Sequence, residues 1–456
     1  MNCKKRLILV FKRGIMKILI LGLGLNGGGA SAARYFAGKA DVRISDISPR
    51  ETFGPLADEM EALGINCHFS DKDPKENIKW ADIVIKNPAI PNTLPQLSLA
   101  KNIQNDFSYL FSSPLIKDIK LILVTGTKGK STTVSAITHA LNRLGNSAIY
   151  CGNIGVSAFE ILKDLENRQI DKKPLPNYIV AEMSSWQIHD TNIALNGVWP
   201  NTELTILTSL YRDHQNRYHS LTEYYDDKLT LINDKCKHIL INIRTKLYVD
   251  KHTHGLKRKI KLFPTLFNPY AGNKIELMCA FNALKLLGFK KDEIIKALSS
   301  YKGIPHRIEQ IAIKNDIMFI NDSAATISEA VTFSTSTLYP LSYHLICGGT
   351  DKDIKALGML PALKSATSIL LLDGSFTTDK LIPLLNKYQL PYYGPYNNLR
   401  DAFEKAVDNA EEKKGFNNQM QVVILSPGAA SFGMFKNEFD RGDSFRRLVG
   451  EYVSRA

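Results

Sequence analysis

Residues 119–140 read IKLILVTGTKGKSTTVSAITHA, and this stretch decides the fold of the chain around it. Apart from Lys120, its first six residues, 119–124, are apolar and rich in β-branched side chains, which is typical of a buried parallel strand. A glycine-rich loop follows. Beyond the loop, apolar residues recur at the spacing of one helical face: Val134, Ile137, Ala140, Leu141 and Leu144. The pattern predicts a strand, a loop and a helix in that order.

The loop between that strand and that helix has the composition of a phosphate site. Gly126 and Gly129 allow backbone N–H groups to close around a polyphosphate, and the helix N-terminus adds a partial positive charge. Lys130 would bring a cation to the β- and γ-phosphates, and the Ser131 hydroxyl can join a Mg²⁺ shell. The glycine spacing is tighter than in GxxxxGK[ST]. A tight turn with an exposed lysine is the alternative, but the strand–loop–helix context favours phosphate binding. The predicted ATP contacts are Gly126, Thr127, Lys128, Gly129, Lys130, Ser131 and Thr132.

The composition is that of an ordinary globular protein. A chain of 456 residues suggests about three domains of roughly 150 residues each. No run of 18 apolar residues occurs, so we expect no membrane span. Residues 1–15 are basic with a short apolar core, but Lys12 and Arg13 interrupt it and no cleavage site of small residues follows. We therefore expect Met16 to be the start and residues 1–15 to be an upstream extension.

Cysteine usage and charge restrict the class of protein further. The six cysteines are scattered without a CxxC pair, which favours reduced thiols in a cytoplasmic protein over a zinc site or a disulfide framework. The formal net charge of +13 would suit a nucleic-acid partner. However, lysine and arginine are spread along the whole chain, so a general lysine bias or anionic small substrates explain the charge at least as well. We expect a monomer without nucleic-acid or membrane partners.

The first part of the chain carries a GxGxxG pattern at residues 22–27, directly after a short apolar run. Asp46 ends the next predicted strand, 22 residues after Gly24, as in a dinucleotide fingerprint. The pattern specifies a glycine turn and an acid near a ribose, so NAD, another nucleotide and a turn that binds nothing all stay open. Further strands are predicted at residues 66–69 and 82–86. The second ends in the turn NPAIP, and residues 102–118 look like a connection to the next domain.

The phosphate loop opens a central domain with strands predicted at residues 148–151, 178–181 and 204–208. The first of these is followed by GNIG, and the second delivers Glu182 to a strand end beside the phosphate loop. A carboxylate there is well placed for Mg²⁺, with a surface acid as the alternative. A helix with Lys228 is predicted after the segment YRDHQNR. We expect short strands and loops over residues 245–272 and helices over residues 273–287 and 291–299.

A third unit begins at the sequence IPHR, residues 304–307. Strands predicted at residues 318–320, 344–347, 368–372 and 421–425 alternate with helical patterns, which indicates a second doubly wound sheet. Polar clusters follow three of these strands: NDS at 321–323, GGTDK at 348–352 and SPGAAS at 426–431. Because parallel strands end at one edge, these clusters predict a ligand-facing edge.

Eight motifs along the chain together resemble the Mur ligases, in order and at the separations of that family: GTKGKST, GNIG, EMSSWQ, DHQNRY with Lys228 downstream, GIPHR, INDS, GGTDK and SPGAASF..FKNEFDRG. The resemblance covers residues 16–450 and is strongest to the branch that adds D-glutamate. It implies an α/β fold of three domains, each a mostly parallel sheet with flanking helices. These are a Rossmann-like UDP-sugar domain at 16–108, a P-loop ATPase domain at 109–303 and a Rossmann-like domain at 304–456 that binds the amino acid and closes on the nucleotide.

The chemistry that the resemblance implies is ATP-dependent amide ligation in cytoplasmic peptidoglycan precursor synthesis, and thereby in cell-wall growth, cell shape and division. ATP phosphorylates the carboxylate of UDP-N-acetylmuramoyl-L-alanine, the amine of D-glutamate attacks the mixed anhydride, and phosphate leaves. A carboxylate is a poor electrophile until its oxygen becomes part of a leaving group. Several negative charges then converge on one pocket, so cations must be built into it.

The resemblance also implies roles for individual residues. Lys130 stabilises the transferring phosphoryl group, and Ser131 and Glu182 hold one Mg²⁺. His214 and Lys228 match a second metal position, at which the lysine is carbamylated and so becomes an anionic oxygen ligand. The remaining implied contacts are Asn282, Arg307 and Asp322 for the nucleotide; Leu25, Asn26, Asp46, Asn87, Asn153, Ser184 and Gln187 for the UDP-sugar; and Thr326, Lys352 and Ser431 for the amino acid.

The chain departs from the family pattern at four positions. Ala324 stands where many members have lysine, and Glu438 where an aromatic residue often flanks the amino acid. Ala89 replaces a glycine of the turn at residues 87–91, and Ile47 replaces a hydroxyl residue beside the nucleotide. The first two concern the amino-acid pocket, so L-glutamate stays open as a substrate. A folylpolyglutamate synthetase-like ligase, a nucleotide-binding sensor and a NAD-dependent dehydrogenase each explain fewer of the motifs.

Overall fold

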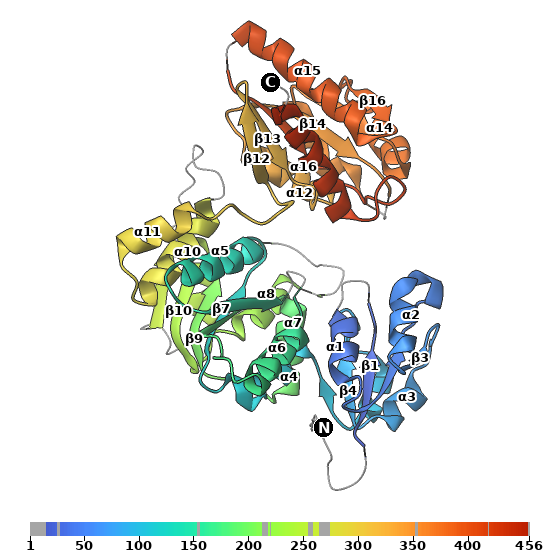
Figure 1. Cartoon of the computed structure of the whole chain (residues 1–456), viewed down its shortest axis with the longest axis vertical. Helices are drawn as coiled ribbons and strands as arrows, with labels where there is room; N and C mark the ends of the chain where they lie inside the picture. Colours follow the sequence, from blue (N-terminus) through green and yellow to red (C-terminus); the bar gives the residue numbers. More distant parts are fainter. Residues whose placement is uncertain are drawn as a thin grey trace. The chain divides into compact units, whose positions relative to one another are not determined.

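The computed structural model describes residues 15–24, 28–152, 156–211, 218, 220–253, 259–263, 274–351, 354–417 and 419–454. Three sheets with flanking helices follow one another along the chain (Figure 1). The chain forms two compact units, Met1–Thr265 with Ile275–Tyr301 and Leu266–Lys274 with Lys302–Ala456. The first two sheets belong to the first unit and the third sheet to the second. The α/β class expected from the sequence is confirmed, and the three domain boundaries stay predictions.

The first sheet has five parallel strands in the order β3-β2-β1-β4-β5. Its strands are β1 (Lys17–Leu21), β2 (Asp41–Ser45), β3 (Asn66–His68), β4 (Ile83–Lys86) and β5 (Ile103–Gln104). The helices of this part are α1 (Gly28–Phe36), α2 (Pro55–Ala62), α3 (Lys75–Trp80) and α4 (Asp106–Phe111). The predicted connection, residues 102–118, contains β5 and α4. Because Phe107 and Leu110 of α4 are fully buried, this segment is part of the core as well as a connection.

The second sheet has six parallel strands in the order β11-β10-β9-β6-β8-β7. They are β6 (Lys120–Thr125), β7 (Ala148–Gly152), β8 (Tyr178–Glu182), β9 (Thr202–Leu207), β10 (Cys236–Asn242) and β11 (Ile260–Phe263). The helices are α5 (Lys130–Arg143), α6 (Ala158–Ile170), α7 (Ser185–Ala194), α8 (Leu221–Leu229), α9 (Lys246–His252), α10 (Lys274–Leu286) and α11 (Lys291–Ser299). The expectation of strands and loops from residue 245 is wrong at α9. It agrees with β11, and residues 254–258 and 264–272 lie outside the described part.

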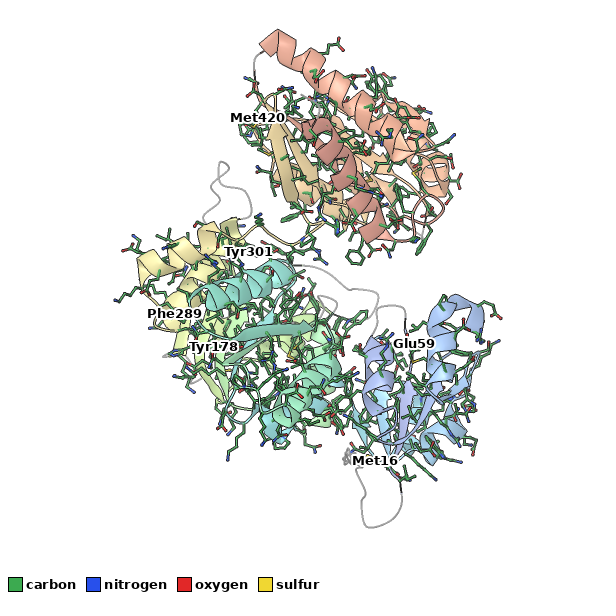
Figure 2. All side chains as sticks on the ribbon, in the orientation of Figure 1. Met16, Glu59, Tyr178, Phe289, Tyr301 and Met420 are labelled. Carbon is green, nitrogen blue, oxygen red and sulfur yellow. The ribbon has the colours of Figure 1, made fainter. Side chains whose placement is uncertain are left out.

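Strand β6 is apolar over residues 121–124 because these residues supply two cores. Leu121 and Leu123 belong to a cluster that also contains residues of the first sheet, whereas Ile122 and Val124 belong to a second cluster under α5 and α10. Successive side chains of a strand point to opposite faces, so a strand with a core on both faces has no polar alternation. Tyr178 belongs to the second cluster, and Phe289 and Tyr301 pack against it (Figure 2).

The third sheet has the order β12-β13-β17-β14-β15-β16 and is parallel except for the β12–β13 pair. Its strands are β12 (Glu309–Lys314), β13 (Ile317–Asn321), β14 (Ser342–Gly348), β15 (Ser368–Leu372), β16 (Tyr393–Tyr396) and β17 (Gln421–Leu425). The helices are α12 (Ser328–Ser336), α13 (Leu360–Ser365), α14 (Ile382–Lys387), α15 (Leu399–Asn417) and α16 (Glu438–Ser454). None of the described helices has the length and apolarity needed to cross a membrane.

Candidate active site

The phosphate loop, residues 126–132, connects β6 to α5 at the carboxyl edge of the second sheet. Gly126 has a φ of +145°, and a Cβ atom there would lie 2.1 Å from Thr208 Oγ1. Gly129 caps α5 in the left-handed conformation, with a φ of +85°. Both positions therefore require glycine. The predicted succession of strand, glycine loop and helix is confirmed, and the N-terminus of α5 presents its first N–H groups at this edge.

Two residues that the sequence analysis did not single out, Thr208 and Ser209, hold the loop from the end of the neighbouring strand β9. The Thr208 hydroxyl donates to the Lys128 carbonyl oxygen at 2.6 Å. The Ser209 hydroxyl accepts from Lys128 N–H at 2.9 Å, and the Ser209 carbonyl accepts from Thr127 N–H at 2.9 Å. The signal for this role was weak: two hydroxyl residues directly after an apolar strand.

Lys130 and Glu182 meet beside the loop. The Lys130 Nζ lies 4.0 Å from Glu182 Oε1 and donates to the Thr127 carbonyl oxygen at 3.2 Å. Glu182 is the last residue of β8, the strand beside β6, and its side chain is only 1% exposed. Its Oε2 has no hydrogen-bond partner among the described residues. A buried carboxylate oxygen without a partner is costly, so the site has a place for a further cationic or donor group.

That donor set fits a magnesium ion. Ser131 follows Lys130 in the first turn of α5 and is buried, so a hydroxyl oxygen and the Glu182 carboxylate belong to the same loop region. Mg²⁺ prefers oxygen ligands and is usually held by one or two protein groups together with phosphates and water. In the described part of the chain, no group of three or more His, Cys, Asp or Glu side chains could hold a metal. His214, the predicted ligand of a second ion, lies outside the described residues.

Lys228 approaches the same loop from α8. It is 2% exposed, and its Nζ donates to the Gly126 carbonyl oxygen at 3.4 Å. The Nζ also lies 4.5 Å from the centroid of the Tyr224 ring. The Tyr224 hydroxyl is 3.2 Å from Thr127 Oγ1, so α8 contacts the loop at two points. The structure therefore brings Lys130, Glu182 and Lys228 together at the phosphate loop.

In the first sheet, Asp46 and Asn87 both contact the glycine turn after β1. Asp46 Oδ2 accepts a hydrogen bond from Leu23 N–H at 2.8 Å. Asn87 Nδ2 donates to the Gly22 carbonyl oxygen at 3.4 Å, and a Cβ atom at Gly24 would lie 2.7 Å from that Nδ2. These two of the residues predicted for the UDP-sugar thus lie after β2 and β4, the strands on either side of β1. Leu25 and Asn26, predicted for the same site, lie outside the described residues.

Ser184 and Gln187 have a local structural role. They form a capping box at the start of α7: the Ser184 hydroxyl accepts from Gln187 N–H at 3.3 Å, and Gln187 Oε1 accepts from Ser184 N–H at 3.0 Å. This cap fixes the N-terminus of α7 directly after Glu182. Asn153, the remaining UDP-sugar residue, is not described.

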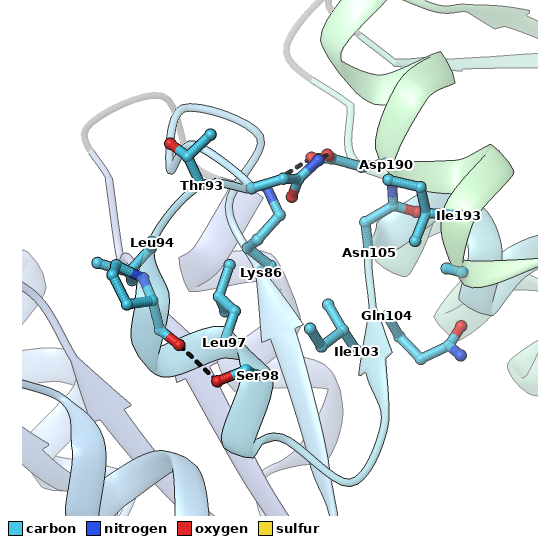
Figure 3. A pocket seen from close by; sticks show the side chains of 13 residues that line it. Lys86, Thr93, Leu94, Leu97, Ser98, Ile103, Gln104, Asn105, Asp190 and Ile193 are labelled. Atoms are coloured by element: carbon cyan, nitrogen blue, oxygen red, sulfur yellow. Dashed lines mark hydrogen bonds and ion pairs between the residues drawn. The ribbon is translucent and has the colours of Figure 1, made fainter.

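A pocket of about 410 Å³ lies beside the end of β4, between β5 and α7 (Figure 3). Its polar wall is an ion pair in which Lys86 Nζ donates to Asp190 Oδ2 at 2.7 Å, with side chains 1% and 3% exposed. Asn92 Nδ2 donates to the other carboxylate oxygen at 2.7 Å. None of the described UDP-sugar residues lines this pocket.

In the second unit, the three predicted polar clusters follow the adjacent strands β13, β17 and β14, and their loops are bonded to one another. Gly428 N–H donates to the Ala325 carbonyl oxygen at 2.8 Å. Thr350 and Ala430 exchange two backbone hydrogen bonds, each of 3.1 Å. The ligand-facing edge that the sequence predicts is thus a continuous set of loops.

These loops carry the residues predicted for the amino acid. Thr326 lies half-buried in the loop after β13, and Ser431 is buried after β17. Lys352, in the loop after β14, lies outside the described residues. Among the departures, Ala324 is half-buried beside Thr326, and Ile47 of the first unit is 70% exposed.

The nucleotide contacts predicted outside the loop are Asn282, Arg307 and Asp322. Asn282 lies on α10, where its Nδ2 donates to the Met278 carbonyl oxygen at 2.8 Å. Asp322 is buried and accepts from the Ser426 hydroxyl at 2.7 Å. Burial raises the pKa of Asp322 to about 6, while its hydrogen bonds and the charge of Arg307 act in the opposite direction. Arg307 and Asp322 belong to the second unit and Asn282 to the first, so their joint action on one nucleotide stays a prediction.

Two further buried side chains connect the motifs of the second unit, and sequence analysis assigned neither of them a role. His306 Nδ1 lies 2.9 Å from Asn321 Nδ2, which also donates to the Gly442 carbonyl oxygen at 3.1 Å. Arg441, one residue earlier, is 1% exposed and contacts the loops after β13 and β17. The contacts of Asn321 with Gly442 and of Arg441 with Ser323 each join residues more than 100 positions apart. Motif spacing alone therefore could not indicate these contacts.

Comparisons with known proteins agree with this architecture. Residues 124–267 match the family model of the Mur ligase middle domain. The chain is 30% identical to the UDP-N-acetylmuramoylalanine–D-glutamate ligase of Borreliella afzelii, over 95% of this chain and 97% of that protein. It is 29% identical to the enzyme of the same name from Bacteroides thetaiotaomicron, over 95% of this chain and 99% of that protein.

A solved structure has the same fold. The UDP-N-acetylmuramate–alanine ligase MurC of Thermotoga maritima superposes with a TM-score of 0.56 at 18% identity, covering 97% of this chain and all of that one. The phosphate loop with Lys130 and the buried Glu182, the three sheets and the full-length relatives lead to the same assignment. The chain belongs to the Mur ligase family, and within it to the UDP-N-acetylmuramoylalanine–D-glutamate ligases.

Proposed function

We propose that the reaction of this ligase, the ATP-dependent addition of D-glutamate to UDP-N-acetylmuramoyl-L-alanine in peptidoglycan synthesis, proceeds through an acyl phosphate formed at the loop of residues 126–132. The observation that carries the proposal is the convergence of Lys130 Nζ and the buried Glu182 carboxylate, 4.0 Å apart, at the N-terminus of α5. A cation, a buried carboxylate and a helix N-terminus together suit the binding of a polyphosphate.

Lys130 has the principal role in the first half of the reaction. Its ammonium group would draw the γ-phosphate toward the substrate carboxylate and stabilise the charge that develops on the transferring group. The amine of the amino acid then attacks the carbonyl carbon, the C–O bond to phosphate breaks, and the amine loses a proton. The hydrogen bonds between Lys128 of the loop and the side chains of Thr208 and Ser209 support this step, because they hold the loop in one conformation.

Magnesium is part of the proposal. Ser131 and Glu182 would hold one ion, and its chemistry would be to neutralise phosphate charge during transfer. His214 and a carbamylated Lys228 would hold a second. Carbamylation joins carbon dioxide to the Lys228 amine with loss of a proton, and it would give the buried Nζ a carboxylate-like end. A carbonyl resonance from ¹³C-labelled bicarbonate that is absent in Lys228→Ala would support it, and its absence from the parent protein would contradict it.

The substrates would contact two separate sets of residues. Leu25, Asn26, Asp46, Asn87, Asn153, Ser184 and Gln187 would bind the UDP-sugar. Thr326, Lys352 and Ser431 would bind the amino acid, and Asn282, Arg307 and Asp322 would complete the nucleotide contacts. Support comes from the positions of Asp46 and Asn87 after β2 and β4, and of Asp322, Thr326 and Ser431 in the loops after β13 and β17. A cytoplasmic monomer without nucleic-acid or membrane partners is also part of the proposal, and the free thiols Cys67, Cys151, Cys236, Cys279 and Cys347 are consistent with it.

A phosphate-release assay tests the function directly. UDP-N-acetylmuramoyl-L-alanine, ATP and Mg²⁺ are supplied with D-glutamate, L-glutamate, D-aspartate or no amino acid. We expect release that depends on both the UDP-sugar and D-glutamate. L-Glutamate belongs in the panel because Ala324 removes a cation near the pocket. Faster turnover with L-glutamate would refute the choice of amino acid, and release without the UDP-sugar would refute the ligase reaction.

The Lys130→Met variant tests the site. Loss of a transition-state charge contact of about 3–4 kcal/mol predicts at least a hundredfold fall in turnover at an unchanged melting temperature. Lys120→Met is the matched control, since Lys120 is exposed at the opposite end of β6. It should stay close to the parent rate. Turnover of Lys130→Met within about tenfold of the parent would contradict the role of Lys130.

A further inference from the structure

Arg441, in the first turn of α16, is the largest fully buried side chain of the described chain and has a relative exposure of 1%. No carboxylate lies within 4.0 Å of its guanidinium among the residues that the structure describes. Burial lowers its pKa to about 10, and the charge of Glu438 opposes that shift. A buried charge of this kind is expensive unless its hydrogen bonds are satisfied, so its contacts should explain its presence.

The contacts of Arg441 all go to two loops. Its Nε donates to the Ser323 hydroxyl at 3.0 Å and one terminal nitrogen donates to the Ser323 carbonyl oxygen at 2.9 Å. Both terminal nitrogens lie 3.2 Å from the Ala429 carbonyl oxygen. Ser323 follows β13 and Ala429 follows β17, which are adjacent strands. One guanidinium therefore bridges the two strand-end loops.

Those loops carry the proposed amino-acid contacts. Thr326 lies three residues after Ser323, and Ser431 lies two residues after Ala429. A dicarboxylic amino acid that contacts both loops requires a fixed distance between them, because a misplacement of about 1 Å can cost a hundredfold in rate. The planar fork of an arginine can hold two carbonyl groups in a fixed relation, which the single ammonium of lysine cannot do.

We propose that Arg441 is a positioning residue of the amino-acid pocket: by bridging Ser323 and Ala429 it fixes the spacing between the loops that present Thr326 and Ser431. The proposal rests on the proposed function, because it takes these loops to bind the amino acid. Arg441 itself does not touch the substrate. Its effect should be largest for the amino acid. The phosphate loop and the glycine turn after β1 belong to the other compact unit, and of the proposed nucleotide contacts Asp322 lies directly before Ser323.

The test is the set of three Michaelis constants of Arg441→Lys, which keeps the positive charge and loses the fork. We expect the KM for the amino acid to rise at least about tenfold, the KM for ATP to rise less, and the KM for the UDP-sugar to stay within about twofold of the parent. Arg447→Lys is the matched control. Arg447 is exposed on the same helix and donates to the Ser444 hydroxyl, so this variant should leave all three constants unchanged.

A purely structural role predicts a different result. In that case Arg441→Lys would lower the melting temperature and the amount of active enzyme, and the KM for the amino acid would not change. That outcome, or an equal rise of all three constants, would overturn the proposal. The KM is measured for whichever amino acid the parent enzyme consumes fastest. Failure of the D-glutamate assignment therefore remains distinguishable from failure of the Arg441 assignment.

Ser323→Ala keeps the proposal testable if Arg441→Lys does not fold. It removes the hydroxyl that accepts from Arg441 Nε and donates to the Glu438 carbonyl oxygen, and it leaves the bonds from Arg441 to the two carbonyl oxygens. We expect a smaller rise, about threefold to tenfold, in the KM for the amino acid, as for loss of one or two hydrogen bonds. An unchanged KM for the amino acid in Ser323→Ala would count against the bridge.

Discussion

Gly442, near the C-terminus, packs against His306, a residue that lies much earlier in the chain. A Cβ atom at this position would lie 2.1 Å from His306 Nδ1, and His306 is itself buried with a φ of +64°. The imidazole cannot move away easily, because its Nδ1 also lies 2.9 Å from Asn321 Nδ2. The glycine of the FKNEFDRG segment is thus required by the histidine of the GIPHR segment.

We predict that Gly442→Ala destabilises the second unit by about 1–3 kcal/mol, the usual cost of overpacking. Gly450→Ala is the control on the same helix, because a Cβ atom there meets nothing within 4 Å, and it should be neutral or stabilising by up to about 1 kcal/mol. All three tryptophans, at positions 80, 186 and 199, lie in the first unit, so calorimetry and circular dichroism are the appropriate measurements. Equal melting temperatures for the two variants would contradict the predicted clash.

Asp322 makes the stability of the second unit depend on pH. Its pKa in the folded chain is about 6, above the ordinary value of 3.8, because it is buried. Between about pH 4 and pH 6 the folded chain therefore holds a proton that the unfolded chain has lost. The contribution of Asp322 to stability falls as the pH rises through this window, by about 3 kcal/mol in total, and is constant above it.

The Asp322→Asn variant, which does not titrate, should reveal this contribution. We predict that its melting temperature relative to the parent rises between pH 4.5 and pH 7.5, because only the parent becomes less stable over that interval. The Ser426 hydroxyl can still bond to an amide at this position. A difference in melting temperature that is the same at both pH values would contradict the raised pKa of Asp322.

At the scale of elements, the phosphate loop is held by strand β9 as much as by its own glycines. We predict that Thr208→Val raises the KM for ATP about threefold to tenfold, because it removes a hydroxyl that donates to the Lys128 carbonyl. The matched control is Thr202→Val, which removes the hydroxyl that donates to the Pro200 carbonyl at the opposite end of β9. Initial rates at varied ATP provide the measurement. If Thr208→Val left the KM for ATP unchanged, the hydrogen bond from Thr208 to Lys128 would not be needed to position the loop.

Several strands with a continuous apolar pattern could be predicted from the sequence, although β10, whose last four residues are buried, was missed. β1, β15 and β17 occur at the predicted residues because each is buried along nearly its whole length. β12 and β16 were missed for physical reasons. β12 is an edge strand with mostly half-buried side chains, and β16, YGPY, contains glycine and proline and is mostly exposed. Their pairing is decided by the neighbouring strand rather than by their own composition.

The same distinction applies to the candidate site. Lys130 and Glu182 could be predicted because both lie at the ends of buried strands, where the local pattern already indicates a ligand-facing edge. Arg441 could not be predicted, because its role depends on the carbonyl oxygens of Ala429 and Ser323, the second of which is distant in sequence, and both reach it only through tertiary packing. Backbone acceptors carry no residue type, so sequence reasoning has no signal for them.

At the scale of the whole molecule, the first unit joins two sheets through contacts between polar as well as apolar residues. A shared core cluster contains residues of both sheets, and Tyr35 of α1 donates to Glu166 of α6 at 2.6 Å. The ion pair between Lys86 of β4 and Asp190 of α7 is the most deeply buried ion pair among the described residues, with side chains 1% and 3% exposed. It therefore couples the end of the first sheet to the helix that follows Glu182.

Removing Lys86 should destabilise the first unit strongly. Lys86→Met leaves Asp190 buried without its cation, which typically costs about 3–5 kcal/mol. Adding Asp190→Asn removes that charge, so the double variant should recover part of the loss. Lys101→Met is the surface control, because its pair with Asp82 is about half exposed and should contribute less than about 1 kcal/mol. Tryptophan fluorescence during urea unfolding reports the first unit specifically. A double variant less stable than Lys86→Met alone would show that Asp190 stabilises this unit by contacts other than the ion pair.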